Sequence, residues 1–304
     1  MQKAKAFADF CLAIDKILPK IRTLILCGQV LIFEKRNDFM IIKKIAALAL
    51  SAAVIAALAG CEGESATLDE LIGNDQTQDT TTAATVNEAE IQWLPDVEIH
   101  NFDMPEAGEK IAVITVKDYG EIKIKLFPED APEGVENFIG LAEMNYYDEI
   151  IFHRIIPNFM IQGGDPRGDG TGGKSIWGDK FDGGTSENLY HFTGAVAYAN
   201  SGSTSTNGSQ FYIVNTPDGY LDMTCAEYYA YSDGQYNWPA NVAEKYGEVG
   251  GVPYLDGGYT VFGQVFEGMD VVRAIASVET DPQNDKPITQ VVMESVRIEE
   301  YTGE

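Results

Sequence analysis

Apolar and polar residues alternate most regularly between positions 110 and 127. Ile111–Val116 is a run of apolar and β-branched residues, which is typical of a β-strand. Asp118–Gly120 then indicates a turn. From 121 to 127, isoleucine and leucine side chains alternate with Glu121, Lys123 and Lys125. This period of two predicts a half-buried strand with its charged residues on one face, so we expect a hairpin.

The pattern changes to a helical period after this hairpin. Asp130 and Ala131 precede Pro132, which fits the first turn of a helix because its missing N–H is not needed there. The apolar residues that follow recur three or four positions apart, namely Val135, Phe138, Ile139 and Ala142. This spacing predicts a helix with one face on the core. A second short helix is predicted from 268 to 276.

The remaining apolar runs are short and are separated by Gly, Asn, Asp and Ser. They are 150–156, 159–162, 195–199, 211–214, 261–265 and a final run at 291–301. Helices do not alternate with these runs, so a parallel βαβ sheet is not favoured. Many short strands with two helices predict a mainly β domain whose antiparallel sheet closes into a barrel, since closure removes exposed strand edges.

Residues 40–60 have the pattern of a secretory signal peptide. Met40 and two lysines precede an apolar run, 45–58, and small residues follow it. Leu58-Ala-Gly-Cys61 resembles a bacterial lipobox, which implies cleavage before Cys61 and a diacylglycerol on its sulfur. We therefore expect an extracytoplasmic lipoprotein anchored to the cell membrane. A transmembrane helix is the alternative, although the run is shorter than the roughly 20 residues that span a bilayer.

A signal peptide that starts at Met40 makes the first 39 residues unusual. Residues 1–39 alternate charged and apolar patches without a clean period. Our hypothesis is that translation starts at Met40 and that residues 1–39 are an upstream extension of the gene model. Mass spectrometry of the cellular protein would then detect no peptide from residues 1–39.

Residues 61–108 have the composition of a flexible acidic linker. They are rich in Thr, Asp, Glu, Ala and Asn, with few apolar residues before Ile91, Trp93 and Leu94. Such a segment cannot bury enough surface to offset its chain entropy. We expect a tether that holds the domain, residues 109–302, away from the membrane, with Trp93 and Leu94 docking onto it.

The net charge of the chain is −26, and it is unevenly distributed. Residues 61–304 hold 43 acidic but only 12 basic residues. This argues against nucleic acid, whose phosphates require Lys and Arg. A solvated acidic surface is the favoured interpretation, and attraction of basic client proteins is the alternative. The four cysteines form no CxxC pair and no histidine lies at ligand spacing beside them, so we expect no metal, no cofactor and no disulfide framework.

Gly168–Ser175 matches the nucleotide-binding pattern GxxxxGK[ST]. A phosphate-binding loop requires a strand before it and a helix after it. Residues 176–181 contain a glycine and show no helical period. We therefore expect a surface loop, whose glycines permit a tight backbone path, and no nucleotide.

The run from Phe152 to Asp165 combines one cation with apolar residues and a few polar ones. Its sequence is FHRIIPNFMIQGGD, the composition of an apolar ligand pocket with a few placed polar groups. It resembles the signature of the cyclophilins, the cyclosporin-binding class of peptidyl-prolyl cis-trans isomerases. Further segments resemble that family in the right order, namely 170–175, 197–200, 206–212 and 255–263. The resemblance covers residues 110–301 and implies an eight-stranded antiparallel barrel capped by two helices.

The resemblance also implies which residues act on an X-Pro bond. The catalytic residues would be Arg154, Gln162 and Phe159. The substrate-binding residues would be His153, Met160, Ala199, Asn200, Gln210, Tyr212, Tyr254, Leu255 and Tyr259. Arginine suits the role because it is always charged and presents a rigid fork of donors to the prolyl nitrogen. We expect His153 to be a hydrogen-bonded structural residue, since isomerisation transfers no proton.

This chain departs from the family pattern beside the pocket. Tyr254 replaces the tryptophan of well-known cyclophilins, which puts tight cyclosporin binding in doubt, and Tyr259 and Tyr212 replace a histidine and a phenylalanine. An aromatic-rich insertion occupies residues 218–252. It forms either an extra substrate wall or a self-packed surface excursion.

We expect a peptidyl-prolyl isomerase that acts on proline-containing peptides and unfolded secreted proteins. A non-catalytic module that binds proline peptides is the alternative.

Overall fold

The computed structural model describes residues 88–303. The predicted signal peptide, the lipidated Cys61, the extension 1–39 and most of the predicted linker lie outside the described residues. Between residues 88 and 303, no helix has both the length and the apolar character needed to cross a membrane.

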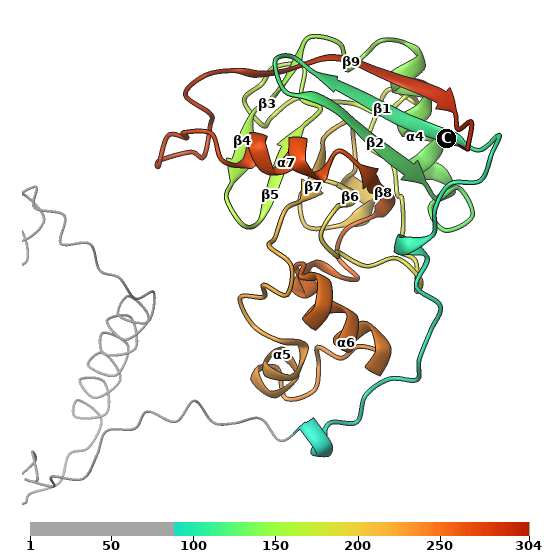
Figure 1. Ribbon diagram of the computed structural model, residues 1–304, viewed down its shortest axis with the longest axis vertical. Helices are drawn as coiled ribbons and strands as arrows, with labels where there is room; N and C mark the ends of the chain where they lie inside the picture. Colours follow the sequence, from blue (N-terminus) through green and yellow to red (C-terminus); the bar gives the residue numbers. More distant parts are fainter. Residues whose placement is uncertain (1–87, 304) are drawn as a thin grey trace, which may run out of the picture. The chain divides into compact units, whose positions relative to one another are not determined.

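One antiparallel sheet of nine strands forms the centre of the domain (Figure 1). The strands are β1 (Lys110–Val116), β2 (Gly120–Leu126), β3 (Ile150–Phe152), β4 (Arg154–Ile156), β5 (Met160–Gly163), β6 (Ala195–Tyr198), β7 (Phe211–Val214), β8 (Val261–Glu267) and β9 (Val291–Glu300). Their order in the sheet is β3-β9-β1-β2-β8-β6-β7-β5-β4. The two end strands follow one another in the chain, so the sheet curls into a nearly closed barrel. The predicted mainly β barrel is confirmed at this level.

The expectation of eight strands was wrong by one. The predicted strand 150–156 divides at His153 into β3 and β4, because its two halves pair with different neighbours. β3 pairs with β9, and β4 pairs with β5. His153 bridges the halves, and its backbone N–H donates to Gln162 O at 3.0 Å.

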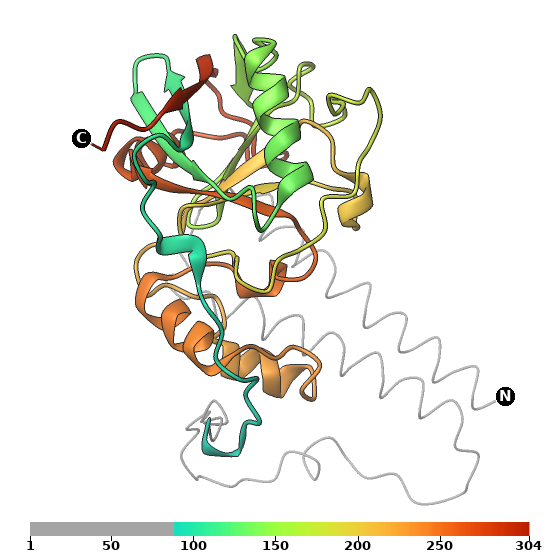
Figure 2. The ribbon, with the colours of Figure 1, turned by 90° about the vertical axis from the view of Figure 1, so that its right-hand side faces the viewer.

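Two helices cover the barrel, as predicted (Figure 2). They are α4 (Pro132–Glu143) and α7 (Met269–Ala276). α4 lies beside β8 and β9, and α7 lies beside β2, β4 and β5. Both helices contribute side chains to the same interior core, including Phe138 and Val272, which are fully buried. The predicted core face of α4 is confirmed at Val135 and Ala142, and Ile139 is partly buried.

The insertion adds two further helices, so the described residues contain four α-helices rather than two. They are α5 (Cys225–Tyr231) and α6 (Ala240–Val249), which lie together outside the barrel (Figure 1). A capping box starts α5: Thr224 Oγ1 accepts from Glu227 N, and Glu227 accepts in return from Thr224 N. The insertion shares an apolar cluster with a barrel loop, made of Tyr190, Phe192, Cys225, Trp238, Val242 and Tyr246. The inner face of the insertion is therefore packed within the protein, as in the alternative of a self-packed surface excursion.

The segment that leads into the domain packs against it from Ile91 onward. Ile91 is buried, and Trp93 packs against the apolar cluster of the insertion. The backbone of Leu94 donates to Trp238 O at 3.0 Å, whereas its side chain is 46% exposed. Asn101 is buried and its Nδ2 donates to both Tyr190 O and Gln264 Oε1. The folded part thus begins near Ile91, earlier than the expected boundary at 109.

Lys125 differs from the predicted exposed face of its strand. The residue is only 9% exposed, because the leading segment covers it. Its Nζ donates to Met104 O at 3.0 Å and to Glu109 Oε2 at 3.1 Å. A buried ammonium group is tolerated here since both partners are oxygen acceptors.

Four short 3-10 helices complete the described elements, and the last of them, η4, carries the site residue Leu255. They are η1 (Glu88–Glu90), η2 (His100–Phe102), η3 (Thr204–Thr206) and η4 (Pro253–Leu255). The GxxxxGK[ST] match at 168–175 lies in bends and irregular chain with no helix after it, as predicted for a surface loop.

Candidate active site

The β4–β5 hairpin separates core residues from site residues by strand alternation. Arg154 pairs with Gln162, and Ile155 pairs with Ile161. Ile155 and Ile161 are fully buried in the barrel core. Because successive side chains point to opposite faces, Arg154 and Gln162 lie on the outer face of the barrel.

Strand pairing extends this outer face across four strands. Gln162 pairs with Tyr212 on β7, and Tyr212 pairs with Ala197 on β6. The register therefore places Arg154, Gln162, Tyr212 and Ala197 in one row across β4, β5, β7 and β6. A guanidinium, an amide, a phenol and a methyl group stand side by side although they come from distant parts of the sequence.

A cavity of about 210 Å³ opens over this row. Its lining consists of Arg154, Phe159, Met160, Gln162, Ala199, Asn200, Tyr212, Leu255 and Tyr259. These nine are all residues that the sequence predicted for the site. The apolar members belong to a second apolar cluster on the outside of the barrel, separate from the interior core.

Three predicted site residues do not line this cavity. Gln210 lies behind Gln162, and the ring of Tyr254 stacks on Phe159 with centroids 6.3 Å apart. His153 is 6% exposed, and neither ring nitrogen has a hydrogen-bond partner within the described residues. The expectation that His153 is hydrogen-bonded through its ring was therefore wrong. Burial is the main cause that lowers its pKa, so the ring is neutral near pH 7.

Two neighbours hold the Arg154 side chain at the edge of the cavity. Its Nε lies 3.4 Å from Asp285 Oδ2, and its Nη1 donates to Gln162 Oε1 at 3.5 Å. The side chain is 41% exposed, so this ion pair contributes little to stability. The main effect of the ion pair is to orient the guanidinium. Within the described residues these contacts use Nε and Nη1, which leaves Nη2 available to a ligand.

A chain of amide groups connects Gln162 to the loop at 168–175, which we call the glycine loop. Gln162 Nε2 donates to Gln210 Oε1 at 3.0 Å. Gln210 Nε2 donates in turn to Gly170 O at 2.9 Å and Gly172 O at 2.8 Å. A Cβ on Gly172 would collide with the Asp165 carboxylate, so the glycine is sterically required. The loop that resembles a nucleotide-binding motif therefore fixes the orientation of two site amides.

Tyr212 at the floor of the cavity is held by a buried hydrogen-bond network. Its hydroxyl lies 2.9 Å from His191 Nε2, and His191 Nδ1 lies 2.7 Å from Asp256 Oδ1. Asp256 Oδ2 also accepts from Trp238 Nε1 and Tyr246 OH, both at 2.8 Å. Burial raises the pKa of Tyr212 well above its usual value, so its hydroxyl stays protonated and can donate to His191. One carboxylate thus joins the pocket floor to the insertion.

The outer edge of the insertion also reaches the site. Tyr228 on α5 lies beside Tyr254, with ring centroids 5.9 Å apart, and Tyr254 stacks on Phe159. The predicted extra wall therefore has a structural basis next to the pocket, in addition to the self-packed inner face.

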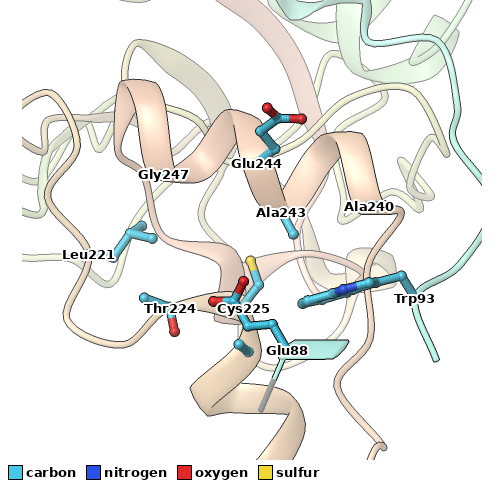
Figure 3. A pocket seen from close by; sticks show the side chains of 10 residues that line it. Glu88, Trp93, Leu221, Thr224, Cys225, Ala240, Ala243, Glu244 and Gly247 are labelled. Carbon is cyan, nitrogen blue, oxygen red and sulfur yellow. The ribbon is translucent and has the colours of Figure 1, made fainter. Parts of the chain in front are cut away.

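A larger cavity of about 400 Å³ lies between the leading segment and the insertion (Figure 3). Trp93 and Cys225 face it, and Glu88 and Glu244 stand at its rim. Burial raises the pKa of the Cys225 thiol far above its usual value, which makes the thiol unreactive. Among the described residues no cation lines this cavity, so they assemble none of the chemistry found around Arg154.

Asp285, His191 and Asp256 are site residues that the sequence reasoning missed. Asp285 enters from the loop between α7 and β9, and its backbone carbonyl also accepts from Ile155 N at 2.8 Å. The only signal for them in the sequence is that Asp256 directly follows Leu255, a residue predicted for the site.

Comparison with known proteins agrees with this geometry. The family model for cyclophilin type peptidyl-prolyl cis-trans isomerases matches residues 111–298. A Staphylococcus aureus protein named for peptidyl-prolyl cis-trans isomerase activity is 45% identical over 195 residues, which are 64% of this chain and 94% of that protein. A crystal structure of a cyclophilin type peptidyl-prolyl cis-trans isomerase from Cryptosporidium parvum is 29% identical, with a TM-score of 0.50, over 63% of this chain and 98% of that one.

A longer relative shares the same region. A Streptococcus pyogenes protein, by name a bifunctional phosphatase/peptidyl-prolyl cis-trans isomerase, is 43% identical over 212 residues. These residues are 69% of this chain but 42% of the relative, so the chain spans less than half of that protein. The family match, the two relatives and the outer-face pocket lead to one assignment: this chain belongs to the cyclophilin-type peptidyl-prolyl cis-trans isomerases.

Proposed function

We propose that the domain isomerises X-Pro bonds by donating a hydrogen bond from Arg154 to the prolyl nitrogen. The observation that carries this proposal is a single guanidinium held at the edge of an apolar cavity of about 210 Å³. Amide resonance gives rotation about the bond a barrier of about 20 kcal/mol. No covalent intermediate is needed to lower it.

The reaction requires stabilisation of a twisted amide. In the twisted state resonance is lost and the prolyl nitrogen becomes an acceptor. Arg154 stabilises that state because its fork is already oriented by Asp285 and Gln162. The donor is then in place before the bond rotates, so little reorganisation is required.

The other lining residues hold the substrate. Phe159, Met160 and Leu255 form an apolar cup for the proline ring, with Tyr212 at its floor. Asn200 stabilises this cup by donating from Nδ2 to Gly258 O at 2.9 Å, which ties the 255–259 segment to the end of β6. Gln162 orients the peptide carbonyl next to the proline.

The proposed clients are unfolded secreted proteins that meet the enzyme at the outer face of the membrane. Support comes from the sequence pattern at 40–61, in which the predicted signal peptide ends at Gly60, directly before Cys61. Two acyl chains are sufficient for stable anchoring. Replacing Cys61 by serine should release the protein from the membrane fraction of the cell, and retention of that variant in the membrane would contradict the anchor.

A non-catalytic module that binds proline peptides is the second candidate. It is favoured by the position of Tyr228, which places the insertion against Tyr254 at the edge of the pocket. A peptide held firmly by both walls would be released slowly. The orientation of Arg154 into the same pocket favours the enzyme.

The deciding experiment measures cis-trans exchange of a short Ala-Pro peptide by NMR with the purified full chain. We expect Arg154→Ala to lose about 100-fold or more in kcat/KM, the loss typical of one preorganised donor. Arg154→Lys should recover little of the rate, because a point charge does not replace the fork. Arg167→Ala is the matched control, since that arginine is exposed directly before the 168–175 loop and contacts Thr171.

Peptide affinity measured on the same variants separates the two candidates. If the domain is an enzyme, Arg154→Ala should bind the peptide with nearly wild-type affinity and yet lose most of the exchange rate. If the wild type binds the peptide without accelerating exchange, the module for peptide binding is correct. Equal rates for wild type and Arg154→Ala would reject the role of Arg154.

A further inference from the structure

A row of aromatic rings leads away from the proline pocket along the insertion. It runs from Phe159 to Tyr254, then to Tyr228 and Tyr236, with successive ring centroids 6.3, 5.9 and 6.1 Å apart. None of these four rings is fully buried, and Tyr236 is 43% exposed. Each ring of the row is therefore at least partly open to solvent.

The row ends at a groove of about 630 Å³. The groove lies between the leading segment, residues 235–239 of the insertion and the 256–257 turn, and its apolar lining includes Leu94, Tyr190, Tyr236 and Trp238. The same loop that supplies Leu255 and Tyr259 to the proline pocket supplies Asp256 and Gly257 to this groove. One short segment therefore lines both sites.

The groove is negatively charged. Asp96, Glu187 and Asp256 line it, and no Lys or Arg of residues 88–303 does. Glu187 is exposed and its side chain has no hydrogen-bond or ion-pair partner within residues 88–303. Burial, followed by the charges of Asp256 and Glu187, raises the pKa of Tyr190 to about 12. Asp256 and Asp96 accept hydrogen bonds from the protein, so a cation in the groove would pair with Glu187.

Charge excludes two occupants from the chain itself. Residues 61–87, which precede the groove in sequence, hold six acidic and no basic side chains. A second copy carries the same net charge of −26. Both would be repelled by Glu187 and Asp96.

We propose that the aromatic row and the groove form an accessory peptide site that holds a lysine- or arginine-bearing segment of the client next to the proline being isomerised. This inference rests on the proposed function and names its substrate class: X-Pro segments flanked by a basic residue. The aliphatic stem of the basic side chain packs on Tyr236 and Leu94, and its charged head lies near Glu187.

The spacing of the rings fits an extended peptide. Alternate side chains of an extended chain lie roughly 6.6 to 7 Å apart, close to the separation of successive rings in the row. At about 3.3 Å per residue, the three steps correspond to about five or six residues between the proline and the base. Attachment at both ends raises the effective concentration of the proline at the pocket.

The test compares long peptides that differ only in the distal charge. In each peptide about six neutral residues separate Ala-Pro from a Lys-Lys or Glu-Glu pair. The charged pair follows the proline in one set of peptides and precedes it in a second set. Affinity and NMR exchange rates are measured with the full chain at low and high salt. We expect the Lys peptide to bind at least about tenfold tighter than the Glu peptide at low salt, and the difference to shrink as salt screens it.

Two variants assign this difference to the groove. Glu187→Gln and Tyr236→Ala should each remove most of the preference for lysine, while turnover of a short Ala-Pro peptide stays within twofold of wild type. Tyr231→Ala is the control, because Tyr231 is 80% exposed on α5 and outside the row. Circular dichroism establishes that each variant is folded.

Three results would overturn the proposal. These are equal affinity for the Lys and Glu peptides, a lysine preference that survives both variants, and a Tyr236-dependent dimer in sedimentation, which would assign the groove to a second copy. Failure of the proposed function would be seen separately. The wild type would then show no turnover of the short peptide, while the difference in affinity between the Lys and Glu peptides could still be measured.

Discussion

The Nδ1 of His191 lies 2.7 Å from Oδ1 of Asp256, and this contact links the floor of the proline pocket to the insertion. The imidazole is satisfied on both sides when Nδ1–H donates to Asp256 and Nε2 accepts from the hydroxyl of Tyr212. Asp256 meanwhile accepts from Trp238 and Tyr246. Removal of the carboxylate would affect four side chains at once.

Asp256→Asn should lower the free energy of unfolding by about 1.5–3 kcal/mol, the range for a hydrogen bond to a charged group. Tyr212→Phe should cost about 1 kcal/mol, because it leaves only one hydrogen bond unmade. Since both act through His191, we expect the double variant to lose less than the sum of the single losses. Urea titrations measure all three values, and strict additivity would contradict a shared network.

Asp285→Asn should lower kcat for a short proline peptide several-fold with little change in KM. The amide cannot form the ion pair at Nε, so the guanidinium would sample more orientations. The same change in an Arg154→Ala background should have no further effect. Asp218→Asn is the matched control, because Asp218 pairs with Arg273 on the surface, away from the site. An equal loss in the Arg154→Ala background would show that Asp285 acts independently of Arg154.

Gln210→Glu should lower kcat/KM about tenfold, or about 1.4 kcal/mol. The carboxylate keeps an acceptor for Gln162 but cannot donate to Gly170 O and Gly172 O. The glycine loop would then open more often, so amide hydrogen exchange at 170–173 should accelerate relative to the core strands. Unchanged exchange in the loop together with lost activity would mean that Gln210 acts on the substrate directly.

His153→Leu should reduce the dependence of stability on pH without loss at pH 7. Burial lowers the folded pKa of His153 below the ordinary value of 6.5, so the unfolded state binds the proton more readily. The stability associated with the neutral ring is present above pH 6.5 and is lost as pH falls through the folded pKa. Urea midpoints between about pH 5 and 8 should therefore fall less on acidification in the variant.

His100 provides a control of opposite sign. The hydrogen bond to Asp130 is the main cause that raises its pKa above 6.5. Its contribution is fully present below pH 6.5 and is lost as pH rises through the folded pKa. His100→Asn should therefore reduce stability mainly on the acidic side. The assignment of His153 fails if its variant and the wild type have parallel pH profiles.

Local patterns predicted the barrel elements closely. The alternation at 121–127 corresponds to β2, and the helical spacing from Val135 to Ala142 corresponds to α4. Both signals come from one-sided burial, which a linear sequence records directly. The division of β3 from β4 was not predictable in this way, because it reflects which strand each half pairs with rather than the character of its residues.

The pocket residues came from a motif, whereas their supports required the fold. Arg154 and Gln162 are eight positions apart and face each other through a hairpin. His191 and Asp256 are 65 positions apart and meet in the loops that precede β6 and β8, two strands that pair in the sheet. Val242 and Tyr246 have the i, i+4 spacing of a helix, so the sequence does carry a signal for α6, although the polar and aromatic residues around it make that signal weak.

The packing of Trp93 against the insertion makes two separate parts of the sequence dependent on each other. Trp93, Val97 and Ile99 cover apolar surface that the insertion would otherwise expose, and the cluster that they pack against joins Trp238 and Tyr246 of the insertion to Tyr190 and Phe192 of the barrel loop. Neither part is useful without the other. In the evolution of this family we therefore expect them to be gained and lost together, so that a relative lacking the insertion also lacks the aromatic leading segment.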